Sequence, residues 1–442
     1  MRFSVTKLAQ AMVPPYEATP TGNLPLSSMD RNPRGLRYLY DSIHVFGHGD
    51  EPAKVIREAL SRALVPYYPV AGRIVDSHQG EPEVACTGDG VWFVEASVNC
   101  NLGDVNHLER PLMIPKQALL PCPSPETKEK DAILLVQVTS LGIIILPFFA
   151  FVYPKASYPR FTRIQVTGFT CGGFALGIRF NHAFFDGIGV GQFLKAVAEI
   201  AKGLSRPAVE PIWCREAIPN PPKLCKDPEL LITAPLELLV MDLSLDRVHQ
   251  MQSQLTKETA RTCTKFEVLT AKVWQSLIRA INLDPHVEVC LVFTANVRHL
   301  MHQILPPEGG YYGNCMYRAT ATATRGKIMN SSLGEIVSLI QEAKEELPTR
   351  FSKWLMGDPE ADPFRVPLRY GSLWVTDWTR VGFFELDFAW GRPLHVVPLS
   401  DSEFVPLCFM LKPPADKQSA RLMTRCAAKE HLSRFHDEIN LI

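Results

Sequence analysis

The stretch Phe174-Ala-Leu-Gly-Ile-Arg-Phe-Asn-His-Ala-Phe-Phe-Asp-Gly187 carries the pattern that decides the fold. From Phe174 to Phe180 apolar side chains occupy every second position, which is the period of a half-buried strand. Asp186-Gly187 then indicates a turn, and a helix is expected over 189–204. If the strand period continued, His182 would point to the same face as Phe180. The pattern therefore places a histidine at the edge of a core.

Outward from this stretch, helical and strand patterns alternate, which indicates a mixed α/β protein. Residues 52–65 have one apolar face and are expected to form an amphipathic helix. Further helices are expected where capping boxes occur, and the second has an apolar stripe through Leu333, Ile336, Val337, Ile340 and Leu347. The two boxes are Thr264 with Glu267, before a helix that runs to Ala280, and Ser332 with Glu335.

A chain of 442 residues is long for one hydrophobic core, so two domains are expected. Prolines concentrate in residues 206–236, which we interpret as a crossover linker. The predicted units are an N-terminal domain over 1–205 and a C-terminal domain over 237–442.

Composition excludes several classes of protein. Lys+Arg and Asp+Glu are both 46 and no basic patch occurs, which argues against a nucleic-acid or anionic-membrane partner. The longest apolar run, Leu141 to Tyr153, contains a proline and is too short to span a bilayer. The 11 cysteines are scattered, and no His/Cys cluster has metal-ligand spacing, so no metal is expected. With no secretory signal pattern at the start, a reducing, cytoplasmic location is expected.

Residues 138–165 look foreign to the chain around them. Gln-Val-Thr occurs at 137–139 and again at 165–167, and the residues between have no clear period. A valine codon begins with GT and a glutamine codon can be CAG, the letters at the two ends of an intron. We hypothesise a retained intron at 138–165; the alternative is a genuine surface loop, although long structureless loops are uncommon in compact domains.

His182 and Asp186 are the strongest candidates for chemistry. A neutral imidazole, with a pKa of about 6.5, is suited to take a proton from an alcohol near neutral pH. Asp186 has two possible roles, either to orient the imidazole or to form a structural ion pair. The alternative for His182 is a hydrogen-bonded core histidine without a catalytic role.

A second group of candidates lies downstream, at Thr376 and Trp378. A hydroxyl and an indole N–H are donors suited to a developing oxyanion. The run Asp387-Phe-Ala-Trp-Gly391 resembles a turn packed by aromatic rings. The sequence contains no phosphate-binding loop and no GxSxG nucleophile motif, so serine-hydrolase chemistry has little support.

These motifs together resemble the plant BAHD acyltransferase family over nearly the whole chain. The family signatures HxxxD and DFGWG match His182-Ala-Phe-Phe-Asp186 and Asp387-Phe-Ala-Trp-Gly391. Supporting matches occur in the family's order, at Leu24-Pro-Leu-Ser-Ser-Met-Asp30, Tyr67-Tyr-Pro-Val-Ala-Gly-Arg73, Phe169-Thr-Cys-Gly-Gly-Phe174 and Tyr311-Tyr-Gly-Asn314.

The resemblance implies two chloramphenicol-acetyltransferase-like domains, each a mixed sheet flanked by helices, with a solvent channel between them. It implies a monomer that binds no cofactor or metal and takes acyl-CoA as co-substrate with a small-molecule alcohol as acceptor. His182 would act as general base in a ternary complex, without an acyl-enzyme, and Asp186 would pair with Arg298. Thr376 and Trp378 would face the reacting carbonyl.

The DFGWG-like run is expected to be structural, with Gly187, Arg298 and Gly391 as supporting residues. Asp387 is still placed among the catalytic candidates, because the signature is often assigned to the active site. Ala389 replaces the glycine of DFGWG, which costs about 1 kcal/mol if that position needs a positive φ.

Within the family, the resemblance is nearest to benzyl-alcohol benzoyltransferases, taxane acetyltransferases and grass hydroxycinnamoyl-CoA transferases, which favours an aromatic acyl donor. Two alternatives stay open: an N-acyltransferase that acts on an amine, and a catalytically impaired homologue that only binds ligand because of the 138–165 segment.

Overall fold

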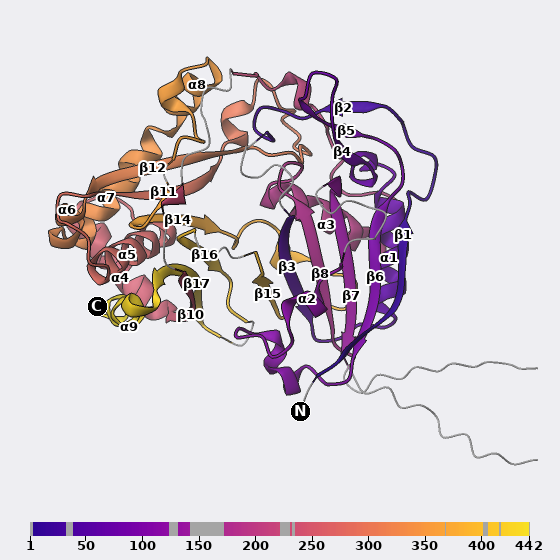
Figure 1. Ribbon diagram of the computed structural model, residues 1–442, viewed down its shortest axis with the longest axis horizontal. Helices are drawn as coiled ribbons and strands as arrows, with labels where there is room; N and C mark the ends of the chain where they lie inside the picture. Colours follow the sequence, from indigo (N-terminus) through magenta and orange to yellow (C-terminus); the bar gives the residue numbers. More distant parts are fainter. Residues whose placement is uncertain are drawn as a thin grey trace, which may run out of the picture.

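The structure is a computed structural model. It describes residues 3–31, 39–122, 131–141, 172–221, 230–231, 235–366, 368–400, 405–414 and 417–441. Two six-stranded sheets lie side by side and form the two halves of the molecule (Figure 1).

The first sheet has the strand order β1-β6-β7-β8-β3-β15. Its strands are β1 (Val5–Val13), β3 (Leu39–Phe46), β6 (Val91–Val98), β7 (Leu134–Leu141), β8 (Phe174–Asn181) and β15 (His395–Pro398). Two helices pack against each other beside this sheet, α1 (Pro52–Ala63) and α3 (Gly187–Ala201). The shorter elements of this half are β2 (Asn23–Pro25), β4 (Arg73–Asp76), β5 (Pro82–Ala85) and α2 (Lys116–Leu119).

The second sheet has the order β10-β17-β16-β14-β11-β12. Its strands are β10 (Leu236–Ser244), β11 (Glu288–Asn296), β12 (Met316–Thr324), β14 (Ser372–Asp377), β16 (Leu407–Leu411) and β17 (Ser419–Ala428). The helices of this half are α4 (Leu245–Thr259), α5 (Lys265–Ala280), α6 (Arg325–Asn330), α7 (Leu333–Glu345), α8 (Leu347–Leu355) and α9 (Lys429–Asn440). A two-stranded ribbon joins β9 (Leu230–Leu231) to β13 (Leu368–Arg369).

Both six-stranded sheets combine parallel and antiparallel pairs, so the predicted class of a mixed α/β protein with two sheet-based units is confirmed. One strand crosses between the halves. β15 follows the second sheet in the chain, but it pairs antiparallel with β3 at the edge of the first sheet. The division of the chain at 206–236 remains a prediction, and β15 shows that the C-terminal part of the chain contributes one strand to the first sheet.

Strand β8 matches the expected position but is more buried than its alternating pattern predicts. Seven of its eight residues are buried, and only Arg179 is partly exposed. The face opposite the apolar side chains carries small residues, and a Cβ at Gly177 would collide with the backbone oxygen of Leu119. The small residues therefore let the segment around Leu119 cover the second face.

The predicted helices form with small shifts at their ends. Both capping boxes are present, with the side chains of Thr264 and Ser332 each accepting from the backbone of a glutamate three residues later. Helix α3 begins at Gly187 rather than 189, because the Asp186 carboxylate caps it by accepting from the Gly189 N–H at 2.7 Å. The stripe that includes Leu347 spans two helices, since α7 ends at Glu345 and α8 begins at Leu347. No helix in the described part of the chain is long and apolar enough to cross a membrane.

Only the first residues of the 138–165 segment lie within the described ranges. Val138 and Thr139 are buried in β7, where they lie opposite Leu176 and Ala175 of β8. Residues 142–171 lie outside the described residues, so the retained-intron hypothesis stays a prediction. The repeated Gln-Val-Thr gives it a structural test, because Val166 and Thr167 supply the same side chains as Val138 and Thr139.

Deletion of residues 138–165 is expected to leave a folded protein, because Val166 and Thr167 can then pair with Leu176 and Ala175 in the register of β7. Shortening the connection also lowers the free-energy cost of closing it, by about 0.6 kcal/mol for each halving of loop length. Thermal unfolding followed by circular dichroism checks this. A melting temperature clearly below that of the full chain, or a mature transcript that encodes Leu141 to Tyr153, counts against the hypothesis.

The turn Asp387–Gly391 has the backbone strain that its sequence suggested. Ala389 has a φ of 77°, in the left-handed region that favours glycine, and Gly391 has a φ of 89°. The Asp387 carboxylate holds the turn by accepting from the N–H groups of Ala389 and Gly391, both at 3.0 Å.

Replacing Ala389 with glycine is expected to raise the free energy of unfolding by up to about 1 kcal/mol, because glycine adopts this conformation without a Cβ penalty. Urea unfolding measures the change. The matched control is Ala343→Gly inside α7, which is expected to lower stability, since glycine weakens a helix interior. A loss of stability in both variants would contradict the claim that the positive φ at Ala389 strains the backbone.

Candidate active site

The turn between β8 and α3 presents His182. Asn181, the last residue of β8, accepts the Ala183 N–H on its side-chain oxygen at 2.9 Å and the Phe184 N–H on its backbone oxygen at 3.0 Å. These bonds fold the backbone tightly, so His182 leaves the strand before the helix begins. Its side chain is partly exposed, whereas Asn181 and Ala183 are fully buried.

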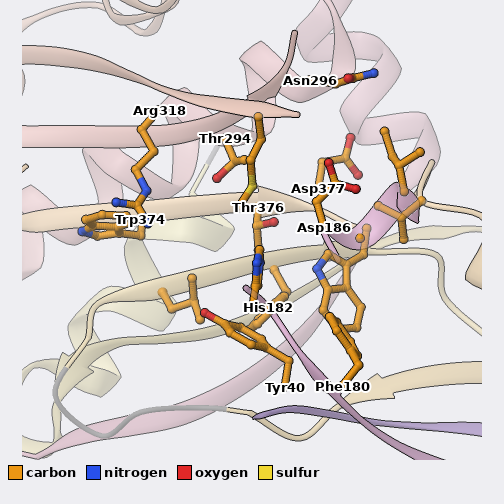
Figure 2. Close-up of a pocket in the computed structure, with 17 residues that line it drawn as sticks. Tyr40, Phe180, His182, Asp186, Thr294, Asn296, Arg318, Trp374, Thr376 and Asp377 are labelled. Atoms are coloured by element: carbon orange, nitrogen blue, oxygen red, sulfur yellow. The ribbon is translucent and has the colours of Figure 1, made fainter. Parts of the chain in front are cut away.

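His182 lines a pocket between the two sheets (Figure 2). Tyr40 of β3 and Phe180 of β8 contribute from the first sheet. The second sheet contributes the larger share of the lining, which includes Thr294, Asn296, Arg318, Trp374, Thr376 and Phe409. The pocket therefore needs both halves of the molecule, and its only histidine among the described residues is His182.

Burial lowers the pKa of His182 below its ordinary value, and the positive charge of Arg318 acts in the same direction. A hydrogen bond to the backbone of the same residue, the charge of Asp186 and the Asn314 side chain oppose this shift. The ring also packs edge-on against Tyr40, with centroids 4.6 Å apart. A neutral, oriented imidazole therefore faces the pocket near neutral pH.

Asp186 is directed to the second half of the molecule. Each carboxylate oxygen accepts two hydrogen bonds: Arg298 donates to both at 2.8 and 2.9 Å, and the N–H groups of Gly189 and Cys315 complete the set at 2.7 and 3.0 Å. Burial by itself raises the pKa of Asp186, but Arg298 and these donors hold it below its ordinary value. The carboxylate is thus saturated by structural partners, and the imidazole is not one of its donors.

Thr376 and Trp378 lie at the end of β14 and both line the pocket. Figure 2 shows Thr376 and His182 among the side chains that line the pocket. Trp378 is buried, and its indole packs edge-on against Phe383 and Phe409, with centroid distances of 5.1 and 5.2 Å. Its backbone N–H donates to the Met410 oxygen at 2.9 Å. These contacts hold Trp378 in the wall of the pocket, to which Thr376 also belongs.

The structure does not bring Asp387 to the pocket. Its carboxylate pairs with Lys202 of the loop after α3 at 3.0 Å and holds the 387–391 turn, to which Gly391 also belongs. Gly187 does line the pocket, where it packs under Val381. Of the sequence candidates, His182, Asp186, Thr376 and Trp378 therefore meet at one site, whereas Asp387 and Gly391 form a separate turn.

Sequence reasoning missed several residues of this site. Tyr40 and Trp374 lie on strands β3 and β14. Tyr40 belongs to no motif, and Trp374 lies in the stretch 372–380 that resembles the family, but neither was assigned a role. Arg318 lies over the Trp374 ring, 5.0 Å from its centroid, and brings a positive charge into the pocket. Within the described ranges, no three His, Cys, Asp or Glu side chains converge as metal ligands.

Comparison with solved structures shows the same fold. Vinorine synthase superimposes with a TM-score of 0.68 at 18% identity, covering 98% of this chain and 96% of that one. TRI101 of F. sporotrichioides, solved with coenzyme A and T-2, gives a TM-score of 0.67 at 16% identity, covering 94% of this chain and 97% of that one.

Sequence relatives extend over the full length. A myricetin 3-O-glucosyl 1,2-rhamnoside 6'-O-caffeoyltransferase of Crocosmia x crocosmiiflora is 44% identical, covering 100% of this chain and 99% of the relative. Acyl transferase 4 of rice (Oryza sativa subsp. japonica) is 40% identical, with 99% of each chain covered. The 3'-N-debenzoyl-2'-deoxytaxol N-benzoyltransferase of Taxus canadensis is 31% identical, covering 98% of this chain and 95% of the relative.

The profile of the Transferase family matches in two pieces, residues 3–145 and 143–442, which meet inside the 138–165 segment. Together the pieces span almost the whole chain, and the relatives above are acyltransferases by name. The chain belongs to the BAHD family of plant acyltransferases.

Proposed function

We propose that this acyltransferase moves an aromatic acyl group, hydroxycinnamoyl or benzoyl, from coenzyme A to the hydroxyl of a small-molecule alcohol, with His182 as the general base. The observation that carries the proposal is the His182 imidazole in a pocket built by both sheets and lined also by Thr376 and Trp378, where burial lowers the pKa of the ring. The caffeoyl and benzoyl groups in the names of relatives support an aromatic donor.

The chemistry proceeds in a ternary complex. Nε2 of His182 takes the proton of the acceptor hydroxyl as the oxygen attacks the thioester carbon, and the carbonyl electrons move onto its oxygen. The Thr376 hydroxyl and the Trp378 indole N–H donate to this oxyanion. When the tetrahedral intermediate collapses, the C–S bond breaks and the imidazolium returns its proton to the leaving thiolate. General-base help of this kind contributes about 10² to 10⁴ in rate, and each oxyanion donor about 2.7–4 kcal/mol.

Asp186 acts through position rather than proton transfer. Its oxygens are occupied by Arg298, Gly189 and Cys315, so it holds the His182 turn against the second sheet. Its charge also favours the imidazolium that forms during the reaction. Asp387, Gly391 and Gly187 support the backbone. The enzyme is proposed to work as a cytoplasmic monomer, with acyl-CoA and acceptor entering a channel between the halves from opposite sides.

A second candidate is transfer to an amine, which the same base can serve. The similarity to a Taxus N-benzoyltransferase supports transfer to an amine as a candidate function. A third possibility is a silent ligand-binding homologue, if the 138–165 segment disturbs the site.

A coenzyme A release assay decides among the three, with benzoyl-, p-coumaroyl- and acetyl-CoA against panels of alcohols and amines, run on the chain with and without residues 138–165. Release that depends on alcohols and is faster with aromatic donors is the proposed result. Release only with amines, or from neither form of the chain, would overturn it.

His182→Ala is expected to lower kcat by about 10² to 10⁴, because the acceptor loses its base. The melting temperature is expected to stay near that of wild type, since the ring faces a pocket. His286→Ala, at an exposed histidine, is the matched control and is expected to keep full activity. Because burial lowers the pKa of His182, activity is expected to persist below pH 6.5 and to fall only as the ring becomes protonated at lower pH. Full activity of His182→Ala would refute the assignment.

Asp186→Asn and Arg298→Ala are each expected to lower stability and activity together, because each leaves one side of a buried pair without its partner. Such changes cost about 3–5 kcal/mol when the pair is fully buried; the Arg298 side chain is 19% exposed, so the lower end is expected here. Urea unfolding and the release assay measure both effects. A stable but inactive Asp186→Asn would instead indicate a direct catalytic role.

A further inference from the structure

Asn314 is buried, with 1% of its surface exposed, and does not belong to the lining of the pocket. It ends the segment Tyr311–Asn314, just before β12. Its side-chain amide donates to the backbone oxygen of His182 at 2.8 Å and to Asp30 Oδ1 at 2.9 Å. Both amide hydrogens are therefore committed, which fixes the plane of the amide. Its own backbone N–H binds the same Asp30 oxygen at 3.0 Å.

Asp30 is held by a buried ion pair with Arg215, and both side chains are 0% exposed. Arg215 Nε donates to Asp30 Oδ2 at 3.0 Å, and the Ser27 N–H and hydroxyl donate to the same oxygen at 2.9 and 2.7 Å. The Arg215 guanidinium also stacks on Trp213, 3.8 Å from the ring centroid. Burying two charges is expensive, and such pairs contribute little net stability. A fully buried pair at this point is better explained by the orientation it imposes.

The network reaches the catalytic turn at two backbone oxygens. Asn314 binds the oxygen of His182, and Arg215 Nη2 donates to the oxygen of Phe184 at 2.6 Å. The next residue after Asn314, Cys315, donates its N–H to Asp186. Three positions of the turn, 182, 184 and 186, are thus bound from segments far away in the sequence.

The backbone oxygen that Asn314 holds belongs to His182 itself, the residue whose imidazole lines the pocket. Fixing this oxygen holds the backbone from which the His182 side chain projects, and with it the direction in which the imidazole enters the pocket. Against the lowering effect of burial, the Asn314 side chain raises the pKa of His182, which favours the imidazolium that exists during the reaction.

We propose that Asn314 is a positioning residue for the general base, which sets the His182 imidazole through its backbone oxygen, and that the buried Asp30–Arg215 pair holds Asn314 for this task. This inference rests on the proposed role of His182. Because neither Asn314 nor Asp30 lines the pocket, their loss changes the direction of the base rather than the binding of substrate.

The test compares Asn314→Ala and Asn314→Ser with Gln275→Ala. Gln275 is a matched control, since its buried amide also donates to a backbone oxygen, that of Ser331 at 2.8 Å, but in α5, remote from the turn. Steady-state kinetics with the best donor and acceptor, the pH profile of kcat/KM and the melting temperature are measured for each. Asn314→Ala is expected to lower kcat by about 10- to 100-fold, the range that a small misplacement of a catalytic group produces, with each KM within about twofold of wild type. The acid limb of its pH profile is expected to move to lower pH. Gln275→Ala is expected to lose stability but to keep its kcat.

The outcomes separate this inference from the proposed function. A wild-type chain without turnover, or turnover that His182→Ala leaves intact, overturns the base assignment itself. Turnover that requires His182 but survives in Asn314→Ala with a kcat within twofold of wild type overturns only the positioning role. A kcat loss no larger than that of Gln275→Ala does the same. If Asn314→Ala does not fold, Asn314→Ser decides: a folded Ser variant with a wild-type kcat overturns the inference, and a reduced kcat at unchanged KM supports it.

Discussion

The Asp186 carboxylate joins the two halves of the molecule at the point where the chain turns from β8 into α3. It caps α3 through Gly189 on one side and binds Arg298 and the Cys315 N–H of the second half on the other. A buried carboxylate survives only when its oxygens are fully paired, so the turn cannot move without breaking several charge-assisted hydrogen bonds. The position of His182, four residues earlier, follows from this constraint.

Burial at the junction also sets the chemistry. The pocket takes Tyr40 and Phe180 from the first sheet and Thr376 and Trp378 from the second, so its walls exist only when the sheets are assembled. Removal of water lowers the pKa of the imidazole and keeps it neutral, and the same low dielectric strengthens donors aimed at a developing charge. The ion pairs that surround the turn fix the orientation of His182, and burial keeps its imidazole unprotonated.

Local patterns in the sequence predicted the local parts of this arrangement. The strand period of 174–180, the Asp186 turn and both capping boxes depend on residues a few positions apart, and all of them are present. The Arg298 partner of Asp186 came from family resemblance, not from spacing. Asp387 was grouped with the catalytic residues because its signature suggested it, but its carboxylate is used within its own turn and on Lys202.

The remaining features depend on contacts that no local pattern encodes. Asp30 and Asn314 are 284 residues apart in the chain, and β15 crosses to the other half to pair with β3. The burial of both faces of β8 depends on Leu119 lying over Gly177.

The central claim, that Nε2 of His182 reaches the acceptor and the acyl carbon together, is tested most directly by a crystal structure with the acceptor and an unreactive acyl-CoA analogue. The account predicts the acceptor oxygen at about 2.6–3.2 Å from Nε2, with the acyl oxygen turned towards Thr376 and Trp378. An acyl carbon bound where the imidazole cannot reach the attacking oxygen would contradict it.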